Sequence, residues 1–345
     1  MNKFIRLFAA FTVVLLIVET SYSQPERQTT KVGTTVAQFL KIPAGARSIG
    51  MGGSAAAVEG DIYSIYWNPG ALARMRTTGE ASFNQARWIA DIDYSFVAAG
   101  LTVDGFGTLG LSVTSVSTPE EVVRTEINPE GDGRVWKYNA LSMGLSYARS
   151  LTDRFSIGFT AKYIREGIWD MSSQGFAFDI GTIYMTNFND LKIGASISNF
   201  GSKMRLDGHN ISFNNFPTGD QGQGPQNVES IYKTESYDIP LTFRIGLAMD
   251  ILRMENIRVT GAIDATHPND NAEYINTGLE FAFNELVFAR AGYKSLLLDQ
   301  TEEGLTWGFG VNFPVTNTTG VKVDYAFADF GRLKDVQYLT VSITY

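Results

Sequence analysis

Histidine and cysteine supply most catalytic and metal centres, and this chain has few of them. Its 345 residues contain no cysteine and two histidines, His209 in a polar stretch and His267 before Pro268. Without cysteine, neither a disulfide framework nor a thiolate metal site is available. A histidine pair would have to join two distant loops, and no nucleophile elbow or zinc-binding helix accompanies them. We therefore predict no catalytic residue, no cofactor and no metal, and a protein that is not an enzyme.

A glycine-rich stretch, Gly50-Met51-Gly52-Gly53, raises the question of phosphate binding. It does not match the pattern G-x-x-x-x-G-K-[ST], and no strand of a dinucleotide-binding fold precedes it. Glycine also permits close backbone approach and positive φ, which suits a chain packed inside a confined lumen. We therefore predict that residues 44–73 form a compact plug, with a helical turn over 54–58 and a sharp exit at Asn68-Pro69-Gly70.

The residues before the plug predict an exported chain. Lys3 and Arg6 precede an apolar run over 7–18, and small residues follow at Ser21 and Ser23. This run of about a dozen residues is shorter than the roughly 20 that a membrane-spanning helix needs, which argues against a membrane anchor. We therefore predict a signal peptide over 1–23 that is cleaved before Gln24. A short helix is expected over 35–42. The plug precedes the first strand in the chain, so we expect it on the periplasmic side of entry.

Beyond residue 77 the apolar residues recur at every second position, as in β-strands. The segments 141–147 and 191–198 alternate apolar residues with small or polar ones, which is typical of a lipid-facing barrel wall. The net charge of −8 argues against nucleic acid as a partner. Fourteen strands are predicted, at 78–87, 90–103, 106–117, 135–149, 154–167, 173–186, 191–200, 237–251, 255–266, 271–284, 286–297, 303–313, 320–330 and 335–345.

The connections between these strands favour a transmembrane barrel over a soluble β-sandwich, whose strands would alternate in the same way. Every second connection is short, and the other set contains all the long ones, including 118–134 and 201–236. Short turns at one end and long loops at the other are typical of outer-membrane barrels. We predict an all-β, 14-stranded antiparallel barrel over 78–345 in contact with outer-membrane lipid, with the residues 24–77 as an extension and lumenal hatch.

The last predicted strand carries a separate indication. Its apolar residues alternate with Thr and Ser, and the chain stops on an aromatic residue. This pattern resembles the carboxy-terminal assembly signal of outer-membrane barrels, and the residues concerned are Leu339, Val341, Ile343 and Tyr345.

A family resemblance rests on two stretches of the plug. The sequence ARSIGMGG at 46–53, followed by YWNPGAL at 66–72, resembles the amino-terminal hatch of the PorV/PorQ family, outer-membrane barrels similar to the FadL fatty-acid channels. FadL-type proteins usually carry Asn-Pro-Ala where this chain has Asn-Pro-Gly. The resemblance implies a hatch that depends on Arg47, Gly50, Gly52, Gly53, Asn68, Pro69 and Gly70.

Two functions follow from the resemblance. A PorV/PorQ-type barrel would bind or deliver secreted protein cargo in type IX secretion and surface attachment, in contact with other secretion components. A FadL-like barrel would instead be a channel for long-chain fatty acids or other hydrophobic small molecules. The plug sequence favours the first.

The long loop over 201–236 also favours protein contact. It mixes acidic and amide residues with spaced apolar ones, whereas a fatty-acid carboxylate would need convergent Arg or Lys. Lys203 and Arg205 at its start are the exception. We take Lys203, Arg205, Phe213 and Phe216 as candidate partner contacts.

Overall fold

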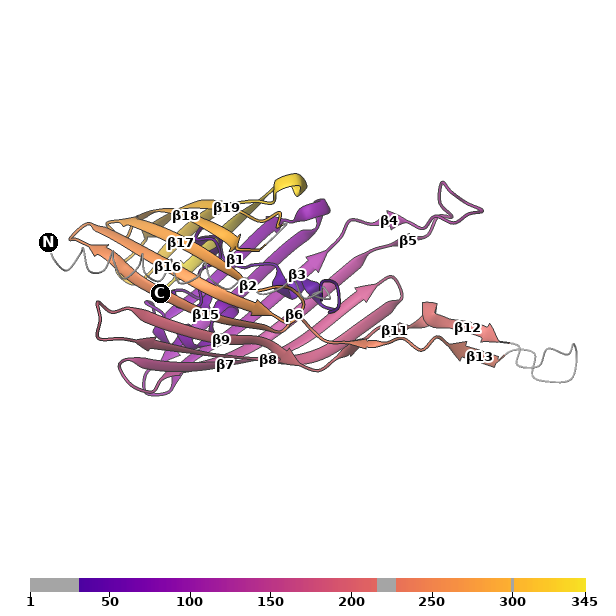
Figure 1. Cartoon of the computed structure of the whole chain (residues 1–345), viewed down its shortest axis with the longest axis horizontal. Helices are drawn as coiled ribbons and strands as arrows, with labels where there is room; N and C mark the ends of the chain where they lie inside the picture. The colour runs from indigo at the N-terminus through magenta and orange to yellow at the C-terminus, as the bar shows by residue number, and fades with distance from the viewer. Residues whose placement is uncertain (1–30, 216–227, 299–300) are drawn as a thin grey trace, which may run out of the picture. The chain divides into compact units, whose positions relative to one another are not determined.

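Strands that are neighbours in the sequence are also neighbours in the sheet. The computed structural model describes residues 31–215, 228–298 and 301–345. Within them, fourteen long strands pair antiparallel in chain order, and β21 pairs with β1 to close the barrel (Figure 1). The strands are β1 Gly79–Arg87, β2 Asp93–Val103, β3 Gly107–Ser117, β6 Tyr138–Ser150, β7 Phe155–Ile168, β8 Met171–Met185, β9 Lys192–Gly201, β15 Thr242–Arg253, β16 Ile257–Pro268, β17 Tyr274–Phe283, β18 Val287–Leu296, β19 Leu305–Pro314, β20 Gly320–Asp329 and β21 Asp335–Thr344.

The predicted fold is confirmed, and each strand lies within a few residues of its expected position. The second strand begins at Asp93 instead of 90, because the preceding 3-10 turn η4 (Ile89–Asp91) contains Ala90 at a positive φ of 59°. Closure satisfies the backbone groups of every strand, which a sheet in lipid requires.

The alternation of the sequence becomes the two faces of the wall. In β21, Leu339, Val341 and Ile343 face outward and are exposed, whereas Thr340 and Ser342 between them are buried against the lumen. A barrel of fourteen strands is too wide for wall side chains alone to fill its lumen. The hatch takes up that space.

The two ends of the barrel differ. We call the end with the connections 104–106, 151–154, 186–191, 254–256, 284–286 and 315–319 the turn end. The other end, the loop end, carries 118–137 and 202–241. Both of these connections extend away from the barrel (Figure 1) as short ribbons, β4 Glu121–Val122 with β5 Val135–Trp136 and β12 Ser212–Asn215 with β13 Val228–Ile231. Smaller elements of the second connection are β10 Met204–Arg205, β11 Asp207–Gly208, η5 His209–Ile211 and β14 Ser236–Tyr237, and η6 Gly331–Leu333 lies between β20 and β21.

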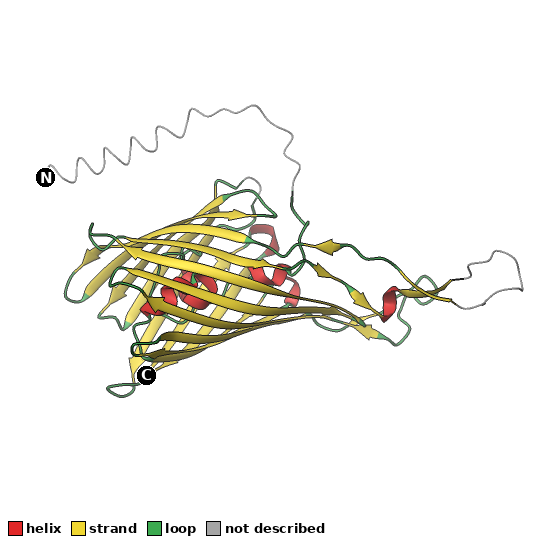
Figure 2. Cartoon of the chain, turned by 90° about the horizontal axis from the view of Figure 1, so that it is seen from below, coloured by secondary structure: helices red, strands yellow, loops and turns green. Residues whose placement is uncertain are grey.

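The hatch consists of short helices enclosed by the strands (Figure 2). They are η2 Gln38–Lys41, α2 Ala46–Gly50, α3 Ser64–Trp67 and η3 Pro69–Arg74. None of the helices in the described part of the chain is long and apolar enough to cross a bilayer. Residues Val32–Tyr345 form one compact unit by their contacts.

Two helix predictions within the hatch are wrong in detail. The helix expected over 35–42 is only the 3-10 turn η2, because Ala37 adopts a left-handed conformation with φ of 53° and donates its N–H to Glu166 of the wall. Residues 54–58 are not helical. The N–H groups of Ala55 and Ala56 are bound by the Asp264 carboxylate of β16, so this backbone is satisfied without a helical turn.

The path of the hatch also differs from the expectation. Val36 donates its N–H to the carbonyl of Asp238 at the loop end, whereas Gly79 begins β1 at the turn end. The hatch therefore runs the length of the lumen from the loop end to the turn end, and is not confined to the side where β1 starts.

Candidate functional site

The wall meets the backbone of the hatch at glycines. A Cβ added to any of five lumen-facing glycines would lie within 2.2 Å of a hatch atom, so no other residue fits there without movement. These glycines come from five different strands and follow the hatch along the lumen. They are Gly158, Gly181, Gly194, Gly278 and Gly292.

The predicted hatch glycines lie at the same contacts. Gly52 has a φ of 69°, and a Cβ on it would lie 2.5 Å from the carbonyl oxygen of Thr277 in β17. Gly53 has a φ of 76° and packs beside the Trp67 ring, and Gly50 lies against Gly308 of β19. The first two therefore need glycine for both conformation and space.

The Asn68-Pro69-Gly70 break is held by a fully buried amide. Asn68 Oδ1 accepts the N–H of Gly70 at 2.9 Å and so caps η3, while Nδ2 donates to the carbonyls of Ala56 and Thr182. Pro69 occupies the first position of η3, where its missing N–H is not needed. The break therefore ties two parts of the hatch to β8.

Wall side chains satisfy the remaining hatch backbone. The N–H of Ala46 donates to Thr340 and that of Gly52 to Thr306, at 3.0 and 2.9 Å. Ser196 and Ser156 donate to the carbonyls of Trp67 and Gly70. Because buried backbone groups are costly when unpaired, these bonds make the hatch a fixed part of the lumen.

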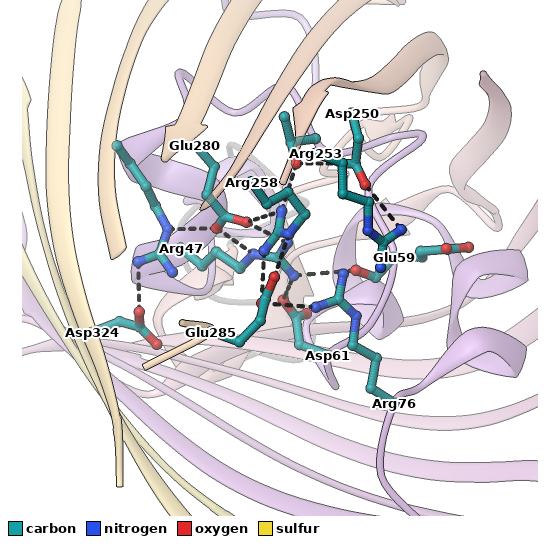
Figure 3. A network of polar contacts seen from close by, with 12 residues as sticks. Arg47, Glu59, Asp61, Arg76, Asp250, Arg253, Arg258, Glu280, Glu285 and Asp324 are labelled. Carbon is teal, nitrogen blue, oxygen red and sulfur yellow. Dashed lines mark hydrogen bonds and ion pairs between the residues drawn. The ribbon is translucent and has the colours of Figure 1, made fainter. Parts of the chain in front are cut away.

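Arg47 connects the hatch to a network of charged side chains in the lumen (Figure 3). Its guanidinium donates to both carboxylate oxygens of Glu280 in β17, at 2.8 and 3.0 Å, and to Asp61 of the hatch at 2.8 Å. Arg258 and Arg290 of the wall also donate to Glu280, which is fully buried. Three guanidinium groups on one carboxylate neutralise a charge that burial would otherwise make very costly.

The network continues toward the turn end. Arg290 pairs with Asp324, and Arg258 pairs with Glu285, which also contacts Arg76 (Figure 3). Hydrogen bonds from Arg258 hold the pKa of Glu285 below its usual value despite partial burial. These side chains surround a cavity of about 280 Å³.

Sequence reasoning found Arg47 but missed its partners. Glu280, Arg258 and Asp324 occupy lumen-facing positions of predicted strands, between outward apolar residues. Charged residues at such positions indicate paired groups in the lumen. That signal was present in the sequence, although it does not identify the pairs.

A second polar cluster holds the hatch at the loop end. Asp270, between β16 and β17, accepts hydrogen bonds from Thr35 and Gln38 at 2.7 and 2.8 Å and pairs with Lys41 at 3.1 Å. Burial alone would raise the pKa of Asp270, but the hydrogen bonds from Gln38 and Thr35 and the charge of Lys41 hold it below its usual value. A separate cavity of only about 10 Å³ is lined by Ile49, Trp67 and Phe330 among others.

The predicted partner contacts lie apart from the lumen. Lys203 pairs with Asp238 and Arg205 lies near Asp207, all of them exposed, so the two cations do not converge on a common point. Phe213 of β12 stacks on Tyr232, which directly follows β13, with ring centroids 4.5 Å apart. Phe216 lies outside the described residues.

The predicted assembly residues all lie on the outer face at the turn end of β21. The side chains of Leu339, Val341, Ile343 and Tyr345 are exposed there. Tyr345 exchanges backbone hydrogen bonds with Gly79, so the last residue of the chain is paired with the first residue of β1. In the described part of the chain, no group of three or more His, Asp or Glu side chains could hold a metal.

Comparison with known proteins gives one family and one fold. The family model described as "Type IX secretion system protein PorV" matches residues 24–225. A search of curated proteins finds no match.

Solved structures with the same fold include two toluene transporters and a FadL homologue. The chain is similar to the Pseudomonas putida toluene transporter TodX and the Ralstonia pickettii toluene transporter TbuX, each at 11% identity and a TM-score of 0.53. A Pseudomonas aeruginosa FadL homologue matches at 11% identity and a TM-score of 0.51. The three alignments cover 87%, 87% and 88% of this chain and 96%, 97% and 98% of the other chains, respectively. At such identities the likeness concerns the fold.

Proposed function

The chain belongs to the PorV family of type IX secretion system proteins, and from this we propose that it binds or delivers secreted protein cargo at the outer membrane. It reaches that membrane by means of a signal peptide over 1–23, which is cleaved before Gln24. The mature chain then has two parts, an extension and hatch over 24–77 and a barrel over 78–345. Cargo is met by the two connections that extend from the loop end, 118–137 and 202–241.

The filled lumen is the observation that carries this proposal. The hatch runs along the whole lumen, and its backbone is bonded to wall side chains from one end to the other. A partner the size of a protein therefore has to be bound outside the lumen. The projecting ribbons offer exposed apolar residues for such contact, among them Phe213, Ile231 and Tyr232 on one and Ile127 on the other.

A FadL-like channel for hydrophobic molecules is the alternative that the fold suggests, since the structural neighbours include toluene transporters. Small-molecule sites usually occupy about 300–1,000 Å³ and are mostly apolar. Among the described residues, one apolar cavity holds about 10 Å³, and two larger cavities, of about 280 and 270 Å³, are lined by many charged side chains. These observations favour cargo handling over a hydrophobic channel.

The test removes the stacked pair on the second ribbon and measures cargo capture. Phe213→Ser with Tyr232→Ser should leave the barrel folded and reduce co-purification of secreted proteins, because the ribbon lies outside the sheet that forms the wall. Ile127→Ser tests the other ribbon by the loss of one exposed apolar side chain. Uptake of a labelled long-chain fatty acid is followed in parallel.

Three results are informative. Lower cargo capture with unchanged fatty-acid uptake supports the proposal. Unchanged cargo capture in both variants would rule out these ribbons as the cargo surface. Fatty-acid uptake that depends on the barrel, together with cargo capture that does not, would replace cargo handling with the channel function.

A further inference from the structure

The charged cavity at the turn end is independent of cargo contact at the loop end. It lies between the hatch residues 60–61 and 76–77 and the turn-end halves of β1, β16 and β18–β21. Its volume of about 280 Å³ is close to the lower limit of roughly 300 Å³ for small-ligand sites. From this cavity we propose a second site, which binds the carboxylate or phosphate group of a small ligand.

The charges that line the cavity favour an anion. Among the described residues around it are five cationic side chains and four carboxylates. The fifth carboxylate of the network, Glu280, is fully buried behind Arg47 and Arg258 and does not line the cavity. An incoming anionic group would therefore meet a lining with one more cation than carboxylate, in which the carboxylate shared by Arg47, Arg258 and Arg290 lies out of its reach.

Arg76 shares its carboxylate partner with a second cation of the lining. Both oxygens of Glu285 are already held by Arg258, at 2.6 and 3.0 Å, and Arg76 reaches one of the same oxygens at 3.3 Å. The side chain of Arg76 is 50% exposed, so its other donors remain accessible from the turn end. Burial, and then the positive charges of Arg47 and Arg258, lower the pKa of Arg76. A further negative charge beside Arg76 would relieve this repulsion.

Thr77 provides the second independent observation. Thr77 lines the cavity, and its buried Oγ1 has no hydrogen-bond partner among the described residues. A buried hydroxyl is usually paired, and an unpaired one costs free energy. Thr77 follows Arg76 directly in the chain, so a ligand oxygen bound by the guanidinium would lie within the same cavity as this hydroxyl. Guanidinium and hydroxyl donors together are typical of carboxylate and phosphate recognition.

The experiment uses the full chain extracted in detergent, with sodium phosphate and sodium acetate as probes against sodium chloride at equal ionic strength. Isothermal titration measures affinity, and the thermal unfolding midpoint provides an independent readout, since a ligand that binds only the folded state raises it. Binding of phosphate alone identifies a phosphate-bearing ligand class, binding of acetate alone a carboxylate-bearing one, and binding of both a site that accepts either group.

Variants that are expected to change the affinity in opposite directions distinguish ligand binding from a purely structural role of the network. Arg76→Gln should weaken binding roughly tenfold, because it removes a charged hydrogen-bond donor, and Thr77→Val should weaken it as well. Glu285→Gln should strengthen binding, because it removes the carboxylate that competes for Arg76. Arg154→Gln, which removes the same charge from another turn at this end, is the control and should bind like the wild type.

The proposal fails if neither probe binds the wild type more tightly than chloride does. It also fails if Arg76→Gln and Glu285→Gln change affinity in the same direction, because a purely structural network would respond in that way. Neither result depends on cargo capture, so the outcome is separate from that of the proposed function.

Discussion

At the scale of single residues, close approach of two backbones is what joins the hatch to the wall. Gly194 and Gly292 have no side chain to pack, and a hatch backbone atom occupies the space that a Cβ would need. A hydrogen bond or van der Waals contact to backbone then replaces the lost side-chain contact. The hatch is therefore sensitive to single methyl groups.

Gly52→Ala tests this sensitivity. The new Cβ would lie 2.5 Å from the Thr277 carbonyl oxygen, in a backbone with φ of 69°, so we expect the hatch to shift and become open to proteases. Gly33→Ala is the control, since Gly33 also has a positive φ (78°) but has nothing within 4 Å of the added Cβ. Limited proteolysis of the extracted barrel compares them, and equal protection of both variants would contradict the packing argument.

Arg47 tests the charge network. Arg47→Met removes the cation that joins Asp61 of the hatch to Glu280 of the wall, and a buried pair broken on one side costs about 3 kcal/mol or more. We expect a lower urea midpoint for unfolding in detergent. Arg332→Met, which breaks an exposed pair with Glu302, should change the midpoint much less. A similar change of the urea midpoint in both variants would mean that burial of the Arg47 network contributes little to the stability of the fold.

Asp270 gives the attachment of the hatch at the loop end a pH dependence. The pKa of Asp270 in the folded chain lies below its usual value. The ionised carboxylate therefore stabilises the attached hatch fully above the unfolded pKa of about 3.9, and this stabilisation is lost as the pH falls through the folded pKa. A spin label on Val32→Cys should therefore become more mobile well below pH 4. Asp270→Asn should make the label mobile at neutral pH as well, and a label with the same mobility at all pH values would contradict this role.

At the scale of elements, the last strand joins the beginning and end of the barrel. β21 pairs with β1 over the whole register from Glu80 with Thr344 to Ala86 with Tyr338. Pairing of the last strand with the first therefore closes the barrel.

Tyr345→Asp tests the predicted assembly signal. The side chain is 54% exposed at the turn end, and a charge there is unfavourable near lipid, so less heat-modifiable barrel should reach the outer membrane. Tyr184→Asp is the matched control, because Tyr184 is outward-facing at the same end but lies inside the chain, in β8. Equal loss of barrel in both variants would point to lipid contact instead of a terminal signal.

The strands could be predicted from the sequence, and the hatch only in part. Period-two alternation is local, so the fourteen strands followed from short windows such as 191–198. The helices of the hatch are too short to be stable alone, and their positions depend on wall groups such as Asp264. The partner of Arg47 is 233 positions away, and no local pattern could pair Arg47 with Glu280. Gly52 and Gly53 could be singled out from the sequence because positive φ and close approach are properties of the residue itself.

At the scale of the whole molecule, the direction of the hatch has a topological consequence. Outer-membrane barrels usually keep short turns on the periplasmic side and long loops outside. With that orientation Val36 and Lys41 of the hatch lie toward the cell surface, since both are bound to loop-end residues. The hatch then descends through the lumen to β1, which starts on the periplasmic side.

The absence of cysteine from the chain makes this topology testable with single-cysteine variants. Val32 is 64% exposed at the loop end, so Val32→Cys should react with a membrane-impermeant maleimide on intact cells. Asn317→Cys, in the exposed turn between β19 and β20, should react only after the outer membrane is permeabilised. Labelling of Asn317→Cys but not Val32→Cys on intact cells would reverse the orientation, and would move both the projecting ribbons and the proposed anion site to the opposite sides of the membrane.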